Sequence, residues 1–267
     1  MDFKNLSCER KDGVLVVTLN RPEKLNSLSL GLLKDLKSCA EAIQRDRALR
    51  AVLLTGAGRG FCAGADLTDP ESFPGPSQSM GQFMASRLRE YYNPAALVWC
   101  NLPAPLVVAL NGVAAGAGAS LALMGDITVA ARSASLKFVF APKLGLVPDM
   151  GGTHFLARRI GEARARALAL TGRAVGAEEA ERIGLIAECV DDGALADRAM
   201  QIAGELAAGP REAFIGVRRL MASAVRSSLA DQLEAEAVEQ TRLGDSPDFV
   251  EGVTAFREKR APRFGAR

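Results

Sequence analysis

The sequence predicts an α/β fold in which strands alternate with crossover helices over about the first 150 residues, followed by a mostly helical C-terminal region. Short β-branched apolar runs recur up to residue 131, and segments with helical periodicity separate them. After the glycine pair at 151–152 the chain becomes rich in Ala, Glu and Arg, which favour helices. No repeat, low-complexity segment or linker divides the chain, so we expect one structural unit with a helical extension.

The first elements follow directly from local patterns. A β-branched run predicts a strand over 13–20, which Pro22 ends, and apolar residues at helical spacing predict a helix over 29–45. A second apolar run predicts a strand over 51–55, and the glycine-rich residues 56–60 close it.

The later elements are read in the same way. Residues 68–80 hold three prolines with Gly and Ser and have no period, so they predict a loop. Further strands are expected over residues 105–110, 126–131 and 187–190. Further helices are expected over residues 82–102, 116–124, 153–171, 177–184, 193–208, 211–224, 228–243 and 247–260.

Composition excludes several classes of protein. Apolar residues make up 48% and charged residues 24% of the 267 residues, as in an ordinary globular protein. The 33 basic and 31 acidic side chains give a net charge of only +2, so neither nucleic acid nor an anionic membrane is predicted as a partner. The longest apolar stretch, 106–124, is broken by Asn111 and three glycines, which indicates a buried strand and helix and not a membrane span.

Cysteine and histidine usage limits the chemistry further. The five cysteines are scattered, form no C-x-x-C pair and follow no secretory signal, so a cytoplasmic protein with reduced thiols is predicted. The single histidine, His154, is too few for a histidine-based metal site. We therefore expect no metal and no separate cofactor.

Two segments of small residues are the first candidates for a functional site. Residues 56–67 follow a predicted strand, and residues 111–120 lie between a strand and a helix. Such loops let a ligand reach backbone N–H groups, and two of them from adjacent strand ends could form an oxyanion hole. Tight helix–strand packing through small residues is the alternative interpretation. Neither segment matches a phosphate-binding or dinucleotide-binding pattern, and Ser120 lacks the late histidine that a serine nucleophile needs.

Five segments, in order, resemble the enoyl-CoA hydratase/isomerase (crotonase) superfamily along nearly the whole chain. They are residues 19–26, 60–67, 109–118, 144–153 and 251–260. The resemblance implies a crotonase-like ββα spiral core over 1–200 and a helical trimerisation region over 201–267. It also implies an acyl-CoA thioester as substrate, with coenzyme A as part of that substrate, and a homotrimer or hexamer.

The resemblance implies roles for individual residues. By position, the amides of Ala65 and Ala117 are the two donors to the thioester oxygen, and an alanine at 117 keeps the N–H that a glycine often supplies in the family. The adenine is expected near Lys24, Leu25 and Ala63, and Phe256 and Lys259 are expected to meet the CoA of a neighbouring subunit. The substrate- and CoA-binding residues implied are Lys24, Leu25, Ala63, Gly64, Asp66, Leu67, Gly116, Phe140, Phe256 and Lys259.

Departures from the family pattern point to the reaction. Hydratases of the family carry two glutamates, whose positions match Ser120 and, within about one residue, Phe140. Adding water needs groups that handle protons, and both are missing here. Asp149 lies among apolar residues on the segment where isomerases and dehalogenases of the superfamily place their working carboxylate, and burial there should raise its pKa. A helix cap is the other interpretation of Asp149, and a loop or cap role is favoured for Asp66.

The sequence therefore predicts an acyl-CoA isomerase that shifts a double bond, or rearranges a ring epoxide, through a thioester enolate with Asp149 as proton shuttle. An enoyl-CoA hydratase of fatty-acid or aromatic-acid degradation and a non-catalytic acyl-CoA binder are the alternatives.

Overall fold

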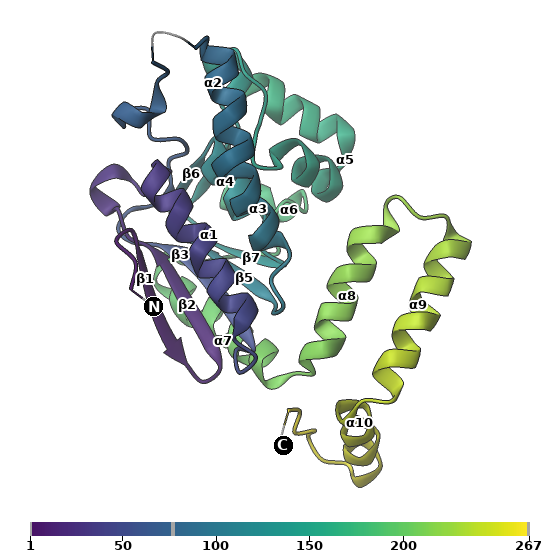
Figure 1. Ribbon diagram of the computed structural model, residues 1–267. Coiled ribbons are helices and arrows are strands. Elements are labelled where there is room, and N and C mark those ends of the chain that lie inside the picture. The colour runs from purple at the N-terminus through teal and green to yellow at the C-terminus, as the bar shows by residue number, and fades with distance from the viewer. Residues whose placement is uncertain (1, 76–77, 266–267) are drawn as a thin grey trace.

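Two stacked layers of strands form the centre of the computed structural model, which describes residues 2–75 and 78–265 (Figure 1). The larger sheet has the strand order β1-β2-β3-β5-β7-β10. Its strands are β1 (Leu6–Lys11), β2 (Val14–Leu19), β3 (Ala51–Gly56), β5 (Leu106–Leu110), β7 (Ile127–Ala131) and β10 (Glu188–Val190). The smaller sheet has the order β4-β6-β8-β9, with β4 (Gly60–Cys62), β6 (Val113–Ala115), β8 (Ser135–Lys137) and β9 (Ala174–Gly176).

The chain visits the two sheets alternately. It runs β3 then β4, β5 then β6, and β7 then β8, and within each sheet these strands are parallel. Helices connect the successive pairs, so each turn of the chain is strand, strand, helix. This is the ββα spiral that the sequence resemblance implies, and the predicted fold class is confirmed.

Helices cover the strands and extend beyond them. They are α1 (Leu30–Arg45), α2 (Met80–Arg87), α3 (Asn93–Cys100), α4 (Ala117–Ala122), α5 (Gly152–Thr171), α6 (Ala177–Arg182), α7 (Leu195–Ala208), α8 (Arg211–Ala224), α9 (Leu229–Gly244) and α10 (Pro247–Glu258). Single turns lie at Pro22–Lys24, Pro70–Ser72 and Asp192–Ala194, and π-helical turns at Leu88–Tyr92 and Phe140–Leu144. None of the helices in the described ranges is both long and apolar enough to cross a membrane. The cytoplasmic location stays a prediction.

The core is apolar and tightly closed. The central strand β5 has no residue more than 3% exposed, and Trp99 of α3, 1% exposed, donates its indole N–H to the Leu36 carbonyl of α1 at 2.9 Å. This bond satisfies the one polar group of the ring while the rest of it fills the space between α1 and α3. The rigid scaffold positions the loops that leave β4 and β6.

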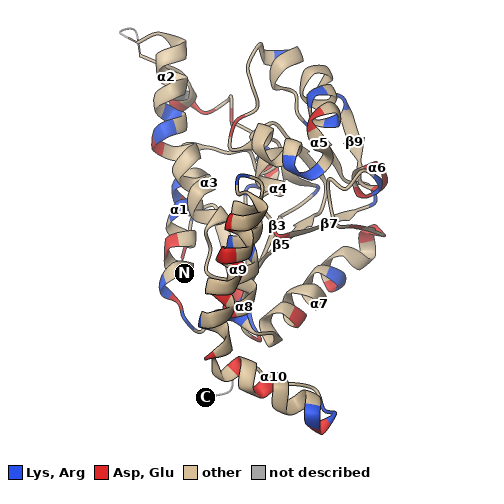
Figure 2. Cartoon of the chain, turned by 90° about the vertical axis from the view of Figure 1, so that its right-hand side faces the viewer, with Lys and Arg blue, Asp and Glu red and all other residues tan. Residues whose placement is uncertain are grey.

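The three C-terminal helices form an arm that stands apart from the core (Figure 1). The predicted boundary between residues 200 and 201 falls inside α7, which packs on the sheet, so the chain leaves the core only at Gly209 and Pro210. Arg218 of α8 attaches the arm, because its Nε bonds to Asp126 at 2.8 Å and its Nη2 to the Cys100 carbonyl at 3.1 Å. Charges of both signs are spread over the helices that Figure 2 shows, without a face of one sign.

The strand β1 and the smaller sheet were not predicted. The Asp12-Gly13 pair between β1 and β2, with both φ angles positive, is a hairpin signal that could have revealed β1. The strands β4, β6, β8 and β9 have three residues each, too few to show a period. The predicted helix 82–102 corresponds to α2 and α3, which are joined by the π-helical turn Leu88–Tyr92 just before Pro94.

Candidate active site

The first loop of the site follows β4 and is hydrogen-bonded to Leu28, which lies two residues before α1. The Gly64 carbonyl accepts from the Leu28 amide at 2.7 Å, and the Asp66 amide donates to the Leu28 carbonyl at 3.1 Å. In an extended segment alternate residues face opposite sides, so the Ala65 amide faces away from Leu28. In the described part of the chain this amide has no acceptor. It is therefore free to donate to a ligand.

The second loop follows β6 and leads into α4. Ala117 is the first residue of this helix, and its amide likewise has no acceptor among the described residues. The loops are in contact: a β-carbon built on Gly64 would lie 3.6 Å from the Ala117 nitrogen. Two unpaired amides on touching loops can donate to one oxygen atom, as the predicted oxyanion hole requires.

Asp149 supplies a buried carboxylate at the same place. Its Oδ1 is the one buried side-chain oxygen or nitrogen that lacks a hydrogen-bond partner in residues 2–75 and 78–265. Burial raises the pKa of this carboxyl from 3.8 to about 6, against a smaller opposing effect of its own backbone N–H. A group with this pKa can accept and return a proton near neutral pH. The following residues, Met150 and Gly151, have φ angles of 47° and 82° and turn the chain into α5.

A cavity of about 100 Å³ brings Ala65 and Asp149 together. It is lined by Leu30, Leu33, Ala65, Leu67, Glu71, Ser72, Phe83, Met84, Arg87, Leu88, Tyr91, Tyr92 and Asp149. Its wall combines apolar and aromatic side chains with three charged ones, Glu71, Arg87 and Asp149.

The helical wall of the cavity contains residues that sequence reasoning missed. The Arg87 guanidinium lies 4.9 Å from the ring centre of Phe83 and 5.3 Å from that of Tyr91. These three residues are four apart, so their spacing along the predicted helix was a signal that could have identified one lining face. Burial, with a smaller effect of the nearby Asp149 charge, raises the pKa of the Tyr92 hydroxyl, which therefore stays protonated.

Asp66 lies beside the cavity, but its carboxylate is already bonded to other side chains of the protein. Its side chain is 5% exposed and pairs with Arg21 at 2.9 Å, and the Thr68 hydroxyl donates to it at 2.7 Å. Burial alone would raise its pKa, but these partners outweigh burial and lower the pKa to about 2. The structural role that the sequence favoured for Asp66 agrees with this geometry.

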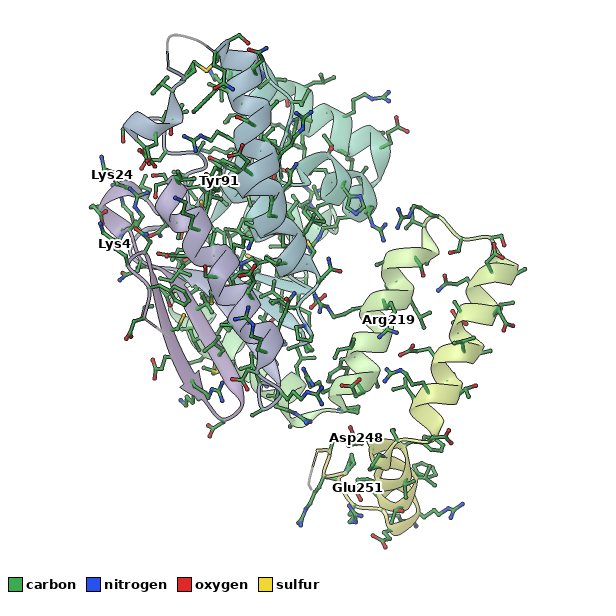
Figure 3. All side chains as sticks on the ribbon, viewed as in Figure 1. Lys4, Lys24, Tyr91, Arg219, Asp248 and Glu251 are labelled. Carbon is green, nitrogen blue, oxygen red and sulfur yellow. The ribbon has the colours of Figure 1, made fainter. Side chains whose placement is uncertain are left out.

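The predicted adenine-binding residues Lys24, Leu25 and Ala63 lie close to one another. The Ala63 amide donates to the Leu25 carbonyl at 3.0 Å, and the exposed Lys24 places its Nζ 3.4 Å from the Thr68 hydroxyl. Figure 3 shows Lys24 and Tyr91 on the same side of the core, away from the arm that carries Arg219. Thr68 directly follows Leu67, which lines the cavity, so the Lys24 ammonium lies near that side of it.

Phe140 lies at the position that matches the second glutamate of the family's hydratases. It is 5% exposed, and its ring would lie 3.6 Å from a β-carbon built on Gly116. It thus packs behind the second loop and does not line the cavity. Phe256 and Lys259 lie at the end of α10, at the far end of the molecule from α2 (Figure 1), so they cannot join this cavity within one chain. No group of three potential metal ligands occurs within the described ranges.

Comparison with known proteins identifies the family. The family model described as Enoyl-CoA hydratase/isomerase matches residues 9–267. A 1,2-epoxyphenylacetyl-CoA isomerase of Escherichia coli K12 is 47% identical over 94% of this chain and 95% of its own length. A probable enoyl-CoA hydratase of Rhodobacter capsulatus is 41% identical over the whole of both chains.

Solved structures agree with this assignment. A putative enoyl-CoA hydratase from Streptomyces coelicolor A3(2) superimposes with a TM-score of 0.91 and 37% identity, over 100% of this chain and 96% of that one. A putative enoyl-CoA hydratase/isomerase from Mycobacterium abscessus gives a TM-score of 0.89 and 36% identity, over 98% of this chain and 100% of that one. The family predicted from the five segments is thereby confirmed: the chain belongs to the enoyl-CoA hydratase/isomerase family.

Proposed function

We propose that this family member is an acyl-CoA isomerase in which Asp149 moves a proton between carbon atoms of the acyl group. The observation that carries the proposal is the unpartnered, buried Oδ1 of Asp149, in the same cavity as Ala65. An unpaired buried carboxylate costs stability, so its presence in a cavity favours a functional role.

The mechanism follows from the three groups. The amides of Ala65 and Ala117 donate to the thioester oxygen and stabilise the negative charge that develops there. The Asp149 carboxylate takes a proton from the α- or γ-carbon, and the electron pair of that C–H bond moves into the enolate. The protonated carboxyl then returns the proton to another carbon, so the double bond moves and no water is consumed. Each amide contributes about 3 kcal/mol to lowering the barrier.

A ring-epoxide substrate fits the same arrangement. The Escherichia coli relative is named as an isomerase of 1,2-epoxyphenylacetyl-CoA. The cavity is small, about 100 Å³, and its walls include Phe83, Tyr91 and Tyr92, which offer flat apolar surfaces to a ring. Polarisation of the thioester by the two amides would assist such a rearrangement.

One observation favours the hydratase alternative. Glu71 also lines the cavity, so a second carboxylate is available even though Ser120 and Phe140 replace the family's glutamates. A displaced pair, Glu71 and Asp149, could activate water. Several relatives are named as probable enoyl-CoA hydratases.

Two substrates and two variants separate the proposals. Migration from a 3-enoyl-CoA creates the absorbance of the conjugated thioester, whereas hydration of crotonyl-CoA removes it. We expect Asp149→Ala to abolish isomerisation while CoA-ester binding persists, and Glu71→Gln to leave it nearly unchanged. Loss of crotonyl-CoA hydration in Glu71→Gln would support the hydratase. Thermal stabilisation by acyl-CoA without turnover of any tested ester would support a binding protein.

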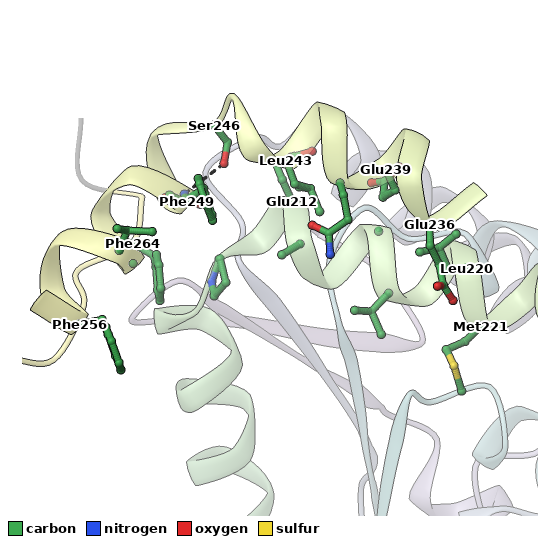
Figure 4. A pocket seen from close by; sticks show the side chains of 18 of the residues that line it. Glu212, Leu220, Met221, Glu236, Glu239, Leu243, Ser246, Phe249, Phe256 and Phe264 are labelled. Atoms are coloured by element: carbon green, nitrogen blue, oxygen red, sulfur yellow. Dashed lines mark hydrogen bonds between the residues drawn. The ribbon is translucent and has the colours of Figure 1, made fainter. Parts of the chain in front are cut away.

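We further propose that the arm assembles the chain into a trimer or hexamer. Large apolar side chains are exposed on all three of its helices, including Val217, Leu233 and Phe256. An open cavity of about 700 Å³ lies between α8, α9 and α10. Figure 4 shows Leu220, Leu243 and Phe249 among the side chains that line it. Exposed apolar side chains gathered on one part of a protein are typical of an interface. Light scattering of the purified protein would measure the mass of the assembly.

A further inference from the structure

We propose that Ser120 is the positioning residue for Asp149: its hydroxyl holds the backbone of Asp149, and so fixes the carboxylate relative to the oxyanion hole. The inference rests on the proposed function and adds to it a residue that no part of the mechanism above uses. Ser120 Oγ donates to the Asp149 carbonyl at 2.8 Å, and the serine is 0% exposed. A buried hydroxyl with one partner 29 residues away in sequence is a specific link between two segments.

The link joins the two halves of the site through one short helix. The first residue of α4, Ala117, supplies one proposed amide donor, and Ser120 follows one turn later on the same helix. All six residues of α4 are buried, so the helix has no freedom to move independently. The distance between the oxyanion donor and the carboxylate is therefore set by α4 and the Ser120 bond.

The backbone around Asp149 needs such a constraint. Its carbonyl accepts both the Ser120 hydroxyl and the Gly152 amide, the latter also at 2.8 Å. Between Asp149 and Gly152 lie Met150 and Gly151, both with positive φ angles. A non-glycine residue such as Met150 adopts that conformation only when its surroundings hold it there. Removing the hydroxyl leaves the turn with one of its two anchors.

The packing around Ser120 leaves little room for a larger side chain, because the serine is fully buried. A β-carbon built on Gly152 would lie 2.6 Å from Ser120 Oγ, so this hydroxyl already fills the space against the start of α5. A glutamate at 120 would have to displace the segment that carries Asp149.

Ser120→Ala tests the role of the hydroxyl. Misplacement of a reacting group lowers the rate more than it lowers binding, so we expect kcat for 3-enoyl-CoA to fall about 10- to 100-fold with KM changed less than about 3-fold. The pH profile is the second readout. Without the bond the carboxyl relaxes toward water and loses part of the effect of burial, so the acidic limb of kcat/KM moves to lower pH.

Three variants separate positioning from packing. Ser120→Cys keeps the volume but donates only weakly, so it should resemble Ser120→Ala, whereas Ser120→Thr keeps the hydroxyl and should restore much of kcat. The matched control is Thr128→Val, which removes an equally buried hydroxyl bonded at 3.0 Å to the Ala122 carbonyl at the other end of α4. It should lower the melting temperature without moving kcat or the pH profile.

The outcomes distinguish this inference from the function on which it rests. If Asp149→Asn is inactive while Ser120→Ala keeps the wild-type kcat and pH profile, the positioning role is wrong and the proposed base stands. If Asp149→Asn keeps wild-type turnover, both are wrong. If Ser120→Cys keeps the wild-type kcat and pH profile, the volume of the side chain and not its hydrogen bond positions Asp149. The inference is then overturned.

Discussion

A β-carbon built on Gly64 would lie 2.7 Å from the carbonyl oxygen of Ala115, so the two loops of the active site touch through their backbones. Gly64 also has a φ of 93°, which a residue with a side chain rarely adopts. Gly64→Ala should therefore push the loops apart and rotate the Ala65 amide away from the oxyanion. We expect kcat/KM to fall about 100-fold or more while the circular dichroism spectrum is unchanged.

Gly204→Ala is the control for this substitution. It lies within α7, where an added β-carbon meets no atom within 4 Å. An alanine there should raise helix stability slightly and leave kcat/KM unchanged. Equal activity of the two variants would show that the close contact between the loops is not needed for catalysis.

The burial of Asp149 predicts a stability that depends on pH. Its pKa is raised from 3.8 to about 6 in the folded chain, so the folded state binds more protons between these values and loses stability as pH rises through them. Asp149→Asn should remove this loss. Allowing for partial exposure, we expect the variant to be about 1–3 kcal/mol more stable than the wild type at pH 7.5. Urea unfolding at pH 4 should show little difference, and a gain of equal size at both pH values would contradict the argument.

The stability that Asp66 contributes should depend on pH in the opposite sense. Its partners lower its pKa from 3.8 to about 2, so the stability it contributes is present above pH 4 and is lost as pH falls toward 2. Asp66→Asn should destabilise the protein by about 2–3 kcal/mol at pH 7, since Arg21 then loses its buried partner. The exposed pair Glu162 and Arg166 is the control, and Glu162→Gln should cost less than about 0.5 kcal/mol in the same urea titration.

The sequence predicted the central strands β2, β3, β5 and β7 of the larger sheet because they are continuous apolar runs that are mostly buried. The strand β5, at 106–110, is an example, and its pattern has no helical alternative at that length. The smaller sheet was missed because its strands derive their stability from the tertiary packing of the spiral. β6 has the sequence Val-Ala-Ala, which alone favours no strand.

In the candidate site, too, some residues could be predicted from local sequence and others depend on tertiary packing. The small-residue loops and Asp149 could be recognised from local sequence, because small side chains and a lone acid in an apolar run are visible there. The roles of Tyr92 and Glu71 could not, since they depend on how the π-helical turn and the 66–73 segment fold over the cavity. The bond between Ser120 and Asp149 joins segments 29 residues apart, and no local pattern encodes it.

The position of α10, far from the cavity of its own chain, predicts that active sites are shared between subunits. Asp149→Asn should be inactive, and Lys259→Glu should raise KM for the CoA ester, because a negative charge repels its phosphates. When the two variants are unfolded together and refolded as mixed oligomers, some sites combine an intact Asp149 with an intact Lys259 from the neighbour. We expect isomerase activity at low substrate to exceed the mean of the two separate variants. Activity equal to that mean would show that Lys259 does not serve a neighbouring site.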